Sequence, residues 1–169
     1  MINNLDIYIK GIKKVLSKNI FPELKNKTIL ITGINGMIGS AIIDVLNYLN
    51  EYENYNIKLI GIVRNKNNLL KRFNDYKNFK VYEQDISSEL NFKESIDYII
   101  NAASNADPSK FAADPVGTII TNFIGTKNLL DYGIKNNCQR LLYISSGEIY
   151  GQGSTNIESF NEKYRGFID

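Results

Sequence analysis

The sequence predicts an α/β fold, a doubly wound parallel sheet with helices on both faces. Five short apolar segments rich in Ile, Leu and Val alternate along the chain with stretches of helical periodicity. The first of these segments runs directly into a glycine-rich turn that is followed by a helical pattern. Parallel strands buried on both faces have this near-continuous apolar character, and the helices between them cover the sheet. No internal repeat or change of composition divides the chain.

The segment before the first strand is expected to form an amphipathic helix. Its apolar residues recur at helical spacing, and Pro22 stands beyond its end. The helix is expected to cover the sheet with Leu5, Ile9, Ile12 and Leu16. Thr28–Thr32 (TILIT) then predicts a buried strand, because the run is short, apolar and β-branched.

The elements after the glycine-rich turn follow the same alternation. A first helix is expected to bury Ile38, Ile42, Val45, Leu46 and Leu49. A short helix is predicted over Leu69–Tyr76, and the segment after Gly151 has no apolar periodicity. The remaining strands are predicted at Ile57–Val63, Phe79–Tyr82, Asp97–Asn101 and Arg140–Ser145.

A long helix is predicted from about Pro115 to Asn136. Proline is tolerated in the first turn of a helix, where its missing N–H has no partner to lose. Gly125 is expected to allow a close approach of this helix to the sheet. The predicted buried stripe consists of Val116, Ile120, Phe123, Leu130 and Ile134.

Composition excludes several kinds of site and partner. The chain has no His and one Cys, so His-based triads and His or Cys clusters for zinc or iron–sulfur are excluded. Twenty basic and 18 acidic residues give a net charge of +2 with no basic cluster, so no nucleic-acid partner is expected. Apolar runs such as Leu59–Val63 are far shorter than the roughly 20 residues of a membrane span. No signal-peptide pattern precedes them, and a cytoplasmic location is expected.

The turn after the first strand, Thr32–Gly39 (TGINGMIG), has the glycine spacing of a dinucleotide-binding turn. It lies between a predicted strand and a predicted helix, which is the context that such a motif requires. Gly33 permits the tight turn, Gly36 allows a pyrophosphate to approach the backbone, and Gly39 allows close packing of the helix. Free N–H groups at the start of the helix would then face the phosphates.

These residues resemble the short-chain dehydrogenase/reductase superfamily, specifically its extended branch, the NAD-dependent epimerase/dehydratase family that acts on nucleotide sugars. The resemblance covers roughly Leu24 to Gly151. Besides the TGxxGxxG spacing, four segments support it in the expected order, namely Arg64-Asn65, Asp85-Ile86, Asn101–Ser104 and Ser145–Gly151 (SSGEIYG).

The resemblance implies a set of cofactor-binding residues for NADP or NAD. Arg64 stands where NAD-preferring relatives carry an acid, so it favours a 2′-phosphate and hence NADP, unless it is only a solvated loop residue or stacks on adenine. Asp85 is expected to accept the adenine amino group or else to form an ordinary turn. Asn122 is expected to brace the strand ends, with an exposed helix position as the alternative. The full set is Thr32, Gly33, Asn35, Gly36, Met37, Ile38, Gly39, Arg64, Asp85, Ile86, Ala102, Ala103, Ser104, Asn122 and Ser145.

The resemblance also implies two catalytic residues. Ser146, four residues before Tyr150, corresponds to the catalytic Ser/Thr that polarises the sugar oxygen. Glu148 corresponds to an acid–base group of related decarboxylases and 4,6-dehydratases, with a surface role as the alternative. The dehydratases carry Asp where this chain has Gly147, which disfavours simple dehydration. Cys138 is expected to serve packing or a turn.

The family's Tyr-x-x-x-Lys pair is missing from its expected place after the Ser146 motif. The single match, Tyr76 to Lys80, precedes the third strand and is not expected to reach the site. The chain is therefore expected to be the N-terminal part of a longer enzyme. Residues 1–24 would be a lead-in, and residues 25–169 an incomplete Rossmann domain.

The expected function is the dinucleotide-binding part of a nucleotide-sugar epimerase, dehydratase or decarboxylase that works through a 4-keto sugar. The substrate would be a nucleotide-diphosphate sugar, and the full-length enzyme is expected to be a homodimer that pairs through Pro115–Asn136. The alternative is a non-catalytic NAD(P)-binding or redox-sensing module. Residues 1–169 alone are expected to be inactive.

Overall fold

The computed structural model describes residues 2–17, 21–105, 107–151, 153 and 158–167. Five parallel strands form one sheet in the order β3-β2-β1-β4-β5, which confirms the predicted doubly wound α/β class. The chain moves outward from β1 to β3 and then crosses back to β4, so the strand order reverses between β1 and β4. The strands are β1 (Thr28–Thr32), β2 (Lys58–Val63), β3 (Phe79–Glu83), β4 (Tyr98–Asn101) and β5 (Arg140–Tyr143).

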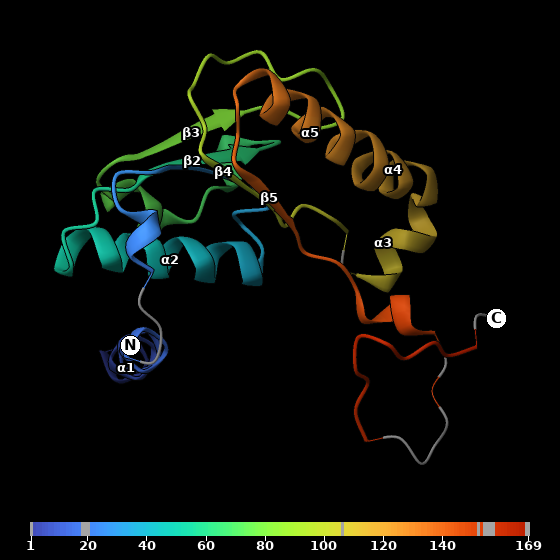
Figure 1. Cartoon of the computed structure of the whole chain (residues 1–169), viewed down its shortest axis with the longest axis horizontal. Helices are drawn as coiled ribbons and strands as arrows, with labels where there is room; N and C mark the ends of the chain where they lie inside the picture. The colour runs from blue at the N-terminus through green and yellow to red at the C-terminus, as the bar shows by residue number, and fades with distance from the viewer. Residues whose placement is uncertain (1, 18–20, 106, 152, 154–157, 168–169) are drawn as a thin grey trace.

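The two faces of the sheet carry separate cores. On one face α2 (Met37–Tyr52) packs against the strands, and α1 (Ile2–Leu16) lies beyond α2 (Figure 1). The other face is covered by α5 (Thr126–Lys135) and the segment after β3. Alternate residues of one strand enter different cores: Ile29 and Ile31 enter the first, and Leu30 enters the second.

The N-terminal helix forms as predicted, but it covers α2 rather than the strands. Ile12 is buried, and Ile9 and Leu16 are half-buried. The side chain of Leu5 lies outside the described part. None of the described helices is long and apolar enough to cross a membrane.

The predicted inner face of α2 needs correction at two positions. Ile38 is 48% exposed, whereas Ile43, which was not in the predicted set, is fully buried. Ile38 lies in the first turn of α2, directly after the glycine-rich turn, and the helix packs on the core from Ile43 onward. Leu46 and Leu49 are buried as predicted, while Ile42 and Val45 are half-buried.

The predicted buried stripe of the long helix is wrong. The side chains predicted to be buried are instead between 42% and 76% exposed to solvent. Ile119, which was not in the predicted set, is exposed beside them. The buried face instead carries Leu129, Tyr132 and two glycines. A Cβ on Gly125 would lie 2.7 Å from Ile86 Cδ1, so glycine permits a close approach to the segment after β3 rather than to a strand. The exposed residues are Val116, Ile120, Phe123, Leu130 and Ile134.

Three other elements differ from the prediction. The helix predicted over Leu69–Tyr76 is replaced by two 3₁₀ turns, η2 (Lys66–Asn68) and η3 (Lys71–Asp75). β5 ends at Tyr143 instead of Ser145, because β4 offers its last pairing residue at Asn101. The long helix consists of α4 (Pro115–Ile120), a π-helical turn η4 (Thr121–Gly125) and α5, and it is preceded by a short helix, α3 (Pro108–Ala113).

Candidate functional site

The glycine-rich turn after β1 is held in place by close backbone contacts. Gly33 has φ +67°, and a Cβ on it would lie 2.2 Å from the carbonyl oxygen of Ala102. A Cβ on Gly39 would lie 2.3 Å from the carbonyl oxygen of Gly33. Gly39 therefore allows α2 to pack on the turn itself. The protein's own packing requires glycine at both positions.

Gly36 differs from these two glycines. Its φ of −75° suits any residue, and a Cβ on it would meet only the Gly33 carbonyl oxygen, at 3.2 Å. Gly36 is also the N-cap of α2, which has no side-chain cap and no acidic residue in its first turn. Unpaired N–H groups and the positive end of the helix dipole favour an anion at this position. Gly36 is also exposed, so the backbone at the start of α2 is open to an approaching phosphate.

A cavity of about 230 Å³ lies at the carboxyl ends of the strands, next to this turn. It lies where the strand order reverses, the usual ligand position in such sheets. Nine predicted cofactor residues line it: Thr32, Gly33, Asn35, Gly36, Arg64, Asp85, Ile86, Ala103 and Ser104. The prediction missed Ile34, Ile62, Val63, Asn65, Asn68, Gln84, Asn105 and Thr121.

The other predicted residues do not line this cavity. Met37 is 85% exposed in the first turn of α2, where Ile38 follows it. Ala102 lies with its backbone against Gly33. Gly39 is buried inside the turn. Ser145 follows the end of β5 and is exposed.

Thr32 is a brace between strands. It is fully buried, and its hydroxyl donates to Asn101 Oδ1 at 2.6 Å. Asn101 Nδ2 donates to the Thr126 hydroxyl at 3.0 Å, and that hydroxyl donates to the Asn122 carbonyl at 2.5 Å. This chain of bonds ties the ends of β1 and β4 to the helix. The sequence does show that a polar residue, Thr32 or Asn101, ends each of these two buried strands. That the two residues pair with each other could not be predicted from the sequence.

Asn122 lies in the π-helical turn. Its Oδ1 is buried and has no hydrogen-bond partner among the described residues, so the alternative of an exposed helix asparagine is wrong. Isolated π turns inside helices are frequent at functional sites. A buried acceptor without a partner costs free energy, which leaves Oδ1 available to a donor from outside the described residues.

Two charged residues, Asp85 and Arg64, line the cavity. Asp85 Oδ1 accepts from the N–H and the hydroxyl of Ser87, at 2.8 and 2.7 Å. Burial alone would raise the pKa of Asp85, but these hydrogen bonds and the nearby Arg64 guanidinium lower it below its usual range. The carboxylate is therefore ionised at neutral pH, and its Oδ2 is free of the bonds from Ser87. Arg64 itself is exposed at the end of β2.

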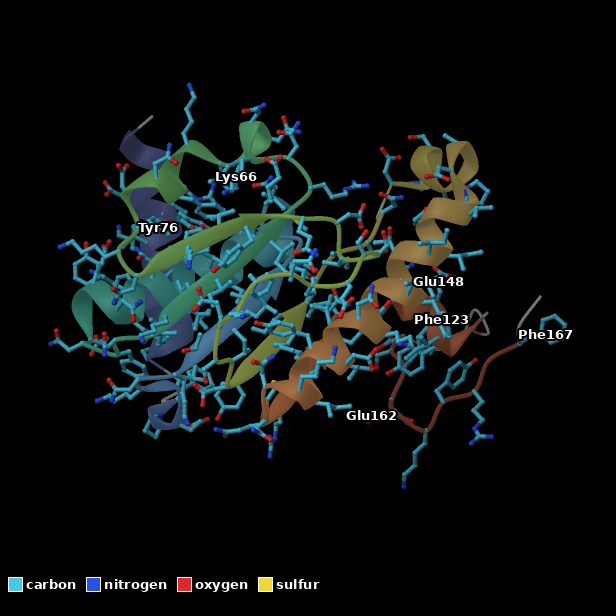
Figure 2. All side chains as sticks on the ribbon, turned by 90° about the horizontal axis from the view of Figure 1, so that it is seen from above. Lys66, Tyr76, Phe123, Glu148, Glu162 and Phe167 are labelled. Carbon is cyan, nitrogen blue, oxygen red and sulfur yellow. The ribbon has the colours of Figure 1, made fainter. Side chains whose placement is uncertain are left out.

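The predicted catalytic residues lie after β5, outside the cavity. Ser146 is the N-cap of the 3₁₀ turn η5 (Gly147–Tyr150), and its hydroxyl accepts from the Glu148 N–H at 3.2 Å. Ser146 and Glu148 are both exposed. Figure 2 shows Glu148 at the end of the molecule where the C-terminal segment lies.

Tyr76 lies far from Glu148, on the opposite side of Figure 2. Its hydroxyl donates to Asp44 Oδ1 at 2.6 Å, and burial together with this bond raises the pKa of Tyr76. Lys80, four residues on, pairs with Glu94 at 2.6 Å. This Tyr-x-x-x-Lys match therefore forms structural contacts, and its tyrosine is a poor base.

A larger groove of about 700 Å³ lies between α5 and the segment 89–95. It is away from the glycine-rich turn, and its lining mixes three lysines with three acids: Lys93, Lys127, Lys135, Glu89, Glu94 and Asp131. Two of these lysines already pair with acids of the groove, Lys127 with Asp131 and Lys135 with Glu89. The smaller cavity at the strand ends is therefore the better candidate site.

The five parallel strands and the glycine-rich turn at the reversal of strand order define an α/β protein of the Rossmann class. Comparison with known proteins gives the family. The model of the NAD dependent epimerase/dehydratase family matches residues 29–165, and the chain belongs to this family.

Relatives include nucleotide-sugar decarboxylases and epimerases. The chain is 35% identical over 147 residues to the bifunctional polymyxin resistance protein ArnA of Wigglesworthia glossinidia brevipalpis, covering 85% of this chain and 21% of ArnA. It is 37% identical over 131 residues to UDP-glucuronic acid decarboxylase 6 of Arabidopsis thaliana, covering 75% and 35%. The structure of WbmH from Bordetella bronchiseptica in complex with NAD+ has a TM-score of 0.56 and 26% identity, over 74% of this chain and 40% of WbmH. The chain thus spans about a fifth to a third of the length of these two curated relatives.

Proposed function

We propose that this chain binds a nicotinamide dinucleotide in the cavity at the strand ends, as the cofactor-binding part of a nucleotide-sugar enzyme. The pyrophosphate would lie over Gly36 and the start of α2, the adenosine between Arg64 and Asp85, and the nicotinamide side toward Ala103. The observation that carries the proposal is the exposed start of α2 at Gly36, which lines the cavity and has neither a side-chain cap nor an acidic residue in its first turn.

The exposed serine and glutamate after β5 supply the proposed sugar chemistry. When bound, the dinucleotide supplies a hydride acceptor. The Ser146 hydroxyl would hold the C4 oxygen of the sugar, and the Glu148 carboxylate would move a proton at the sugar ring. A ketone at C4 acidifies the neighbouring C5–H, which opens routes to epimerisation, dehydration or decarboxylation.

Among these three routes we favour decarboxylation of a nucleotide-linked uronic acid. A C4 ketone is β to the C5 carboxylate, so loss of CO₂ leaves its electron pair in an enolate that the ketone stabilises. Two facts support this choice. Several relatives are UDP-glucuronic acid decarboxylases, at 31–37% identity. Gly147 also takes the place of the acid that dehydratases use.

NADP is the favoured cofactor because of the charges around the cavity. Arg64 lies at the end of β2, next to the expected position of the adenosine ribose. Asp85 is the one carboxylate among the cavity-lining residues, and Ser87 occupies one of its oxygens. The described lining of the cavity therefore has no acid at the end of β2 that would repel a 2′-phosphate.

The exposed apolar stripe of α4 and α5 supports the proposal of a homodimer. Val116, Ile120, Phe123, Leu130 and Ile134 lie on the surface at helical spacing. Surface stripes of this kind mark interaction sites. A second copy of the chain, with its own stripe, would bury both at once.

A non-catalytic dinucleotide-binding module is the second candidate. Its support is the position of Tyr76 and Lys80, which pair with Asp44 and Glu94 away from the cavity. The experiment that tests the proposed function is titration of the chain with NAD and NADP, followed by incubation with UDP-, dTDP-, GDP- and CDP-sugars and uronic acids. We expect dinucleotide binding without turnover by residues 1–169. No binding would overturn the proposal, and turnover would show that another group, with Tyr150 or Tyr164 tested first, is the base.

A further inference from the structure

A buried carboxylate, Asp44 of α2, joins three segments of the chain. Its side chain is 3% exposed. Oδ1 accepts from Arg72 Nε at 3.0 Å and from the Tyr76 hydroxyl at 2.6 Å. Oδ2 accepts from Arg72 Nη2 at 2.9 Å and from the Tyr8 hydroxyl at 2.6 Å. We call these four residues the Asp44 cluster.

The Asp44 cluster is a fully paired buried charge. Each carboxylate oxygen accepts two hydrogen bonds, and the bidentate guanidinium neutralises the charge. Burial and the bond to Asp44 raise the pKa of Tyr8 to about 12, so this phenol stays protonated as a donor. A buried carboxylate that accepts four hydrogen bonds holds its donors in fixed positions, because the loss of any donor leaves part of the charge unpaired.

The cluster connects the two ends of the proposed cofactor site. Asp44 belongs to α2, which begins at Gly36 beside the glycine-rich turn. Arg72 and Tyr76 lie in and directly after η3, which follows the loop 64–70. Arg64, Asn65 and Asn68 of that loop line the cavity.

The loop 64–70 needs the hydrogen bonds of the Asp44 cluster because no regular helix positions it. Between β2 and β3 the chain forms 3₁₀ turns of three and five residues, which have few backbone bonds of their own. The side chains of Leu69, Leu70 and Phe73 pack in the first core and hold the segment between β2 and β3 against it. Apolar contacts are not directional, whereas the bonds to Asp44 fix η3 along and around α2.

We infer that the Asp44 cluster positions the loop that carries Arg64 relative to the phosphate-binding turn, and that α1 takes part in this through Tyr8. α1 precedes residues 29–165, the part that matches the family. Through this hydrogen bond α1 would support the adenosine side of the proposed site. The inference rests on the proposed function, since it concerns the same cavity.

The test compares two ligands in Tyr76→Phe and Tyr8→Phe, each of which removes one hydroxyl. By the proposed function, the dinucleotide that wild type prefers would contact both the loop and the turn, whereas inorganic pyrophosphate would contact only the turn. We expect dinucleotide affinity to fall about three- to tenfold in each variant, less than the loss from a direct charged hydrogen bond to the ligand, because each hydroxyl acts on the site only through the loop. Pyrophosphate affinity, measured by NMR titration, should stay at the wild-type value.

Tyr82→Phe is the matched control. Its hydroxyl also donates to a carboxylate at 2.6 Å, that of Glu94, but Tyr82 packs against the core on the other face of the sheet from Tyr76. It should leave both affinities unchanged. Wild-type dinucleotide affinity in both Asp44-cluster variants would overturn the inference alone, as would an equal loss for the two ligands. Failure of wild type to bind either dinucleotide would overturn the proposed function, and the inference with it.

Discussion

Thr32 and Asn101, 69 residues apart in sequence, share a hydrogen bond of 2.6 Å between fully or almost fully buried side chains. They are the last residues of β1 and β4, and they pair directly in the sheet. The bond therefore closes the sheet at the point where its strand order reverses. The glycine-rich turn and the Ala102–Ser104 segment both start from this pair, so its geometry sets the floor of the cavity.

Removing this bond should destabilise the protein. Thr32→Val keeps the shape of the side chain but leaves Asn101 with a weakened set of partners. We expect a loss of about 1–3 kcal/mol in the free energy of unfolding, measured by urea denaturation. Thr32→Ser, which keeps the hydroxyl, should lose less than Thr32→Val. Equal losses in the two variants would contradict the role of the hydroxyl.

Acid should weaken the opposite end of β1 and β4, their amino ends, through Asp97. Burial alone would raise the pKa of Asp97, but bonds from the Thr28 N–H at 2.8 Å and Lys27 at 3.1 Å lower it. A lowered pKa in the folded state contributes stability above the unfolded value of about 3.9. That stability is lost as the pH falls through the lower folded pKa.

Asp97→Asn should therefore flatten the pH dependence of the free energy of unfolding below about pH 4. Urea denaturation at pH values from 3 to 7, on the order of one unit apart, would measure it. The exposed Asp75 provides a control, because Asp75→Asn should leave the acid slope unchanged. An unchanged slope in Asp97→Asn would refute this role of Asp97 at the amino ends of the strands.

The charge of Arg64 should decide between the two dinucleotides. A charge-assisted contact with a 2′-phosphate contributes roughly 1.5–3 kcal/mol, about ten- to a hundredfold in affinity. Wild type should bind NADP more tightly than NAD, and Arg64→Asp should reverse the order. Calorimetric titration with both dinucleotides measures the preference. Tighter binding of NAD by wild type would mean that Arg64 stacks on adenine or stays solvated.

The apolar stripe of α4 and α5 should hold two copies of the chain together. Phe123 is 70% exposed, so Phe123→Asp should break association without disturbing the core. Sedimentation at several concentrations should give a dimer for wild type and a monomer for this variant. Lys135→Ser, which changes an exposed ion pair on the same helix, should remain dimeric. A monomeric wild type would remove the dimer proposal for this chain.

The strands, the order of elements and the glycine-rich turn could be predicted because local signals determine them. Short β-branched runs indicate buried strands, and the glycine spacing reports the turn. The buried face of the long helix could not be predicted, since glycines and Tyr132 fill it while Phe123 and Ile134 face outward. Periodicity alone finds an apolar stripe, but not the partner that covers it.

Polar contacts between residues far apart in the chain could not be predicted from the sequence either. The Asp44 cluster joins residues up to 36 positions from Asp44, and each of them alone has the character of a surface residue. The chain is rich in asparagine, and part of this has a structural explanation. The described residues other than glycine with positive φ are all asparagines, namely Asn26, Asn54, Asn56, Asn78 and Asn137. Asparagine tolerates this conformation better than other residues with a Cβ.

The central claim, that the glycine-rich turn binds a dinucleotide phosphate, is tested most directly by calorimetric titration of Gly36→Val. Valine would place its side chain over the start of α2, and the Gly33 carbonyl oxygen, 3.2 Å from its Cβ, would have to shift slightly. Gly11→Val is the control, because nothing lies within 4 Å of a Cβ on Gly11. We predict that Gly36→Val loses more than about tenfold in affinity for NAD and NADP, with a native circular dichroism spectrum, and that Gly11→Val binds like wild type. Unchanged affinity in Gly36→Val would contradict the account.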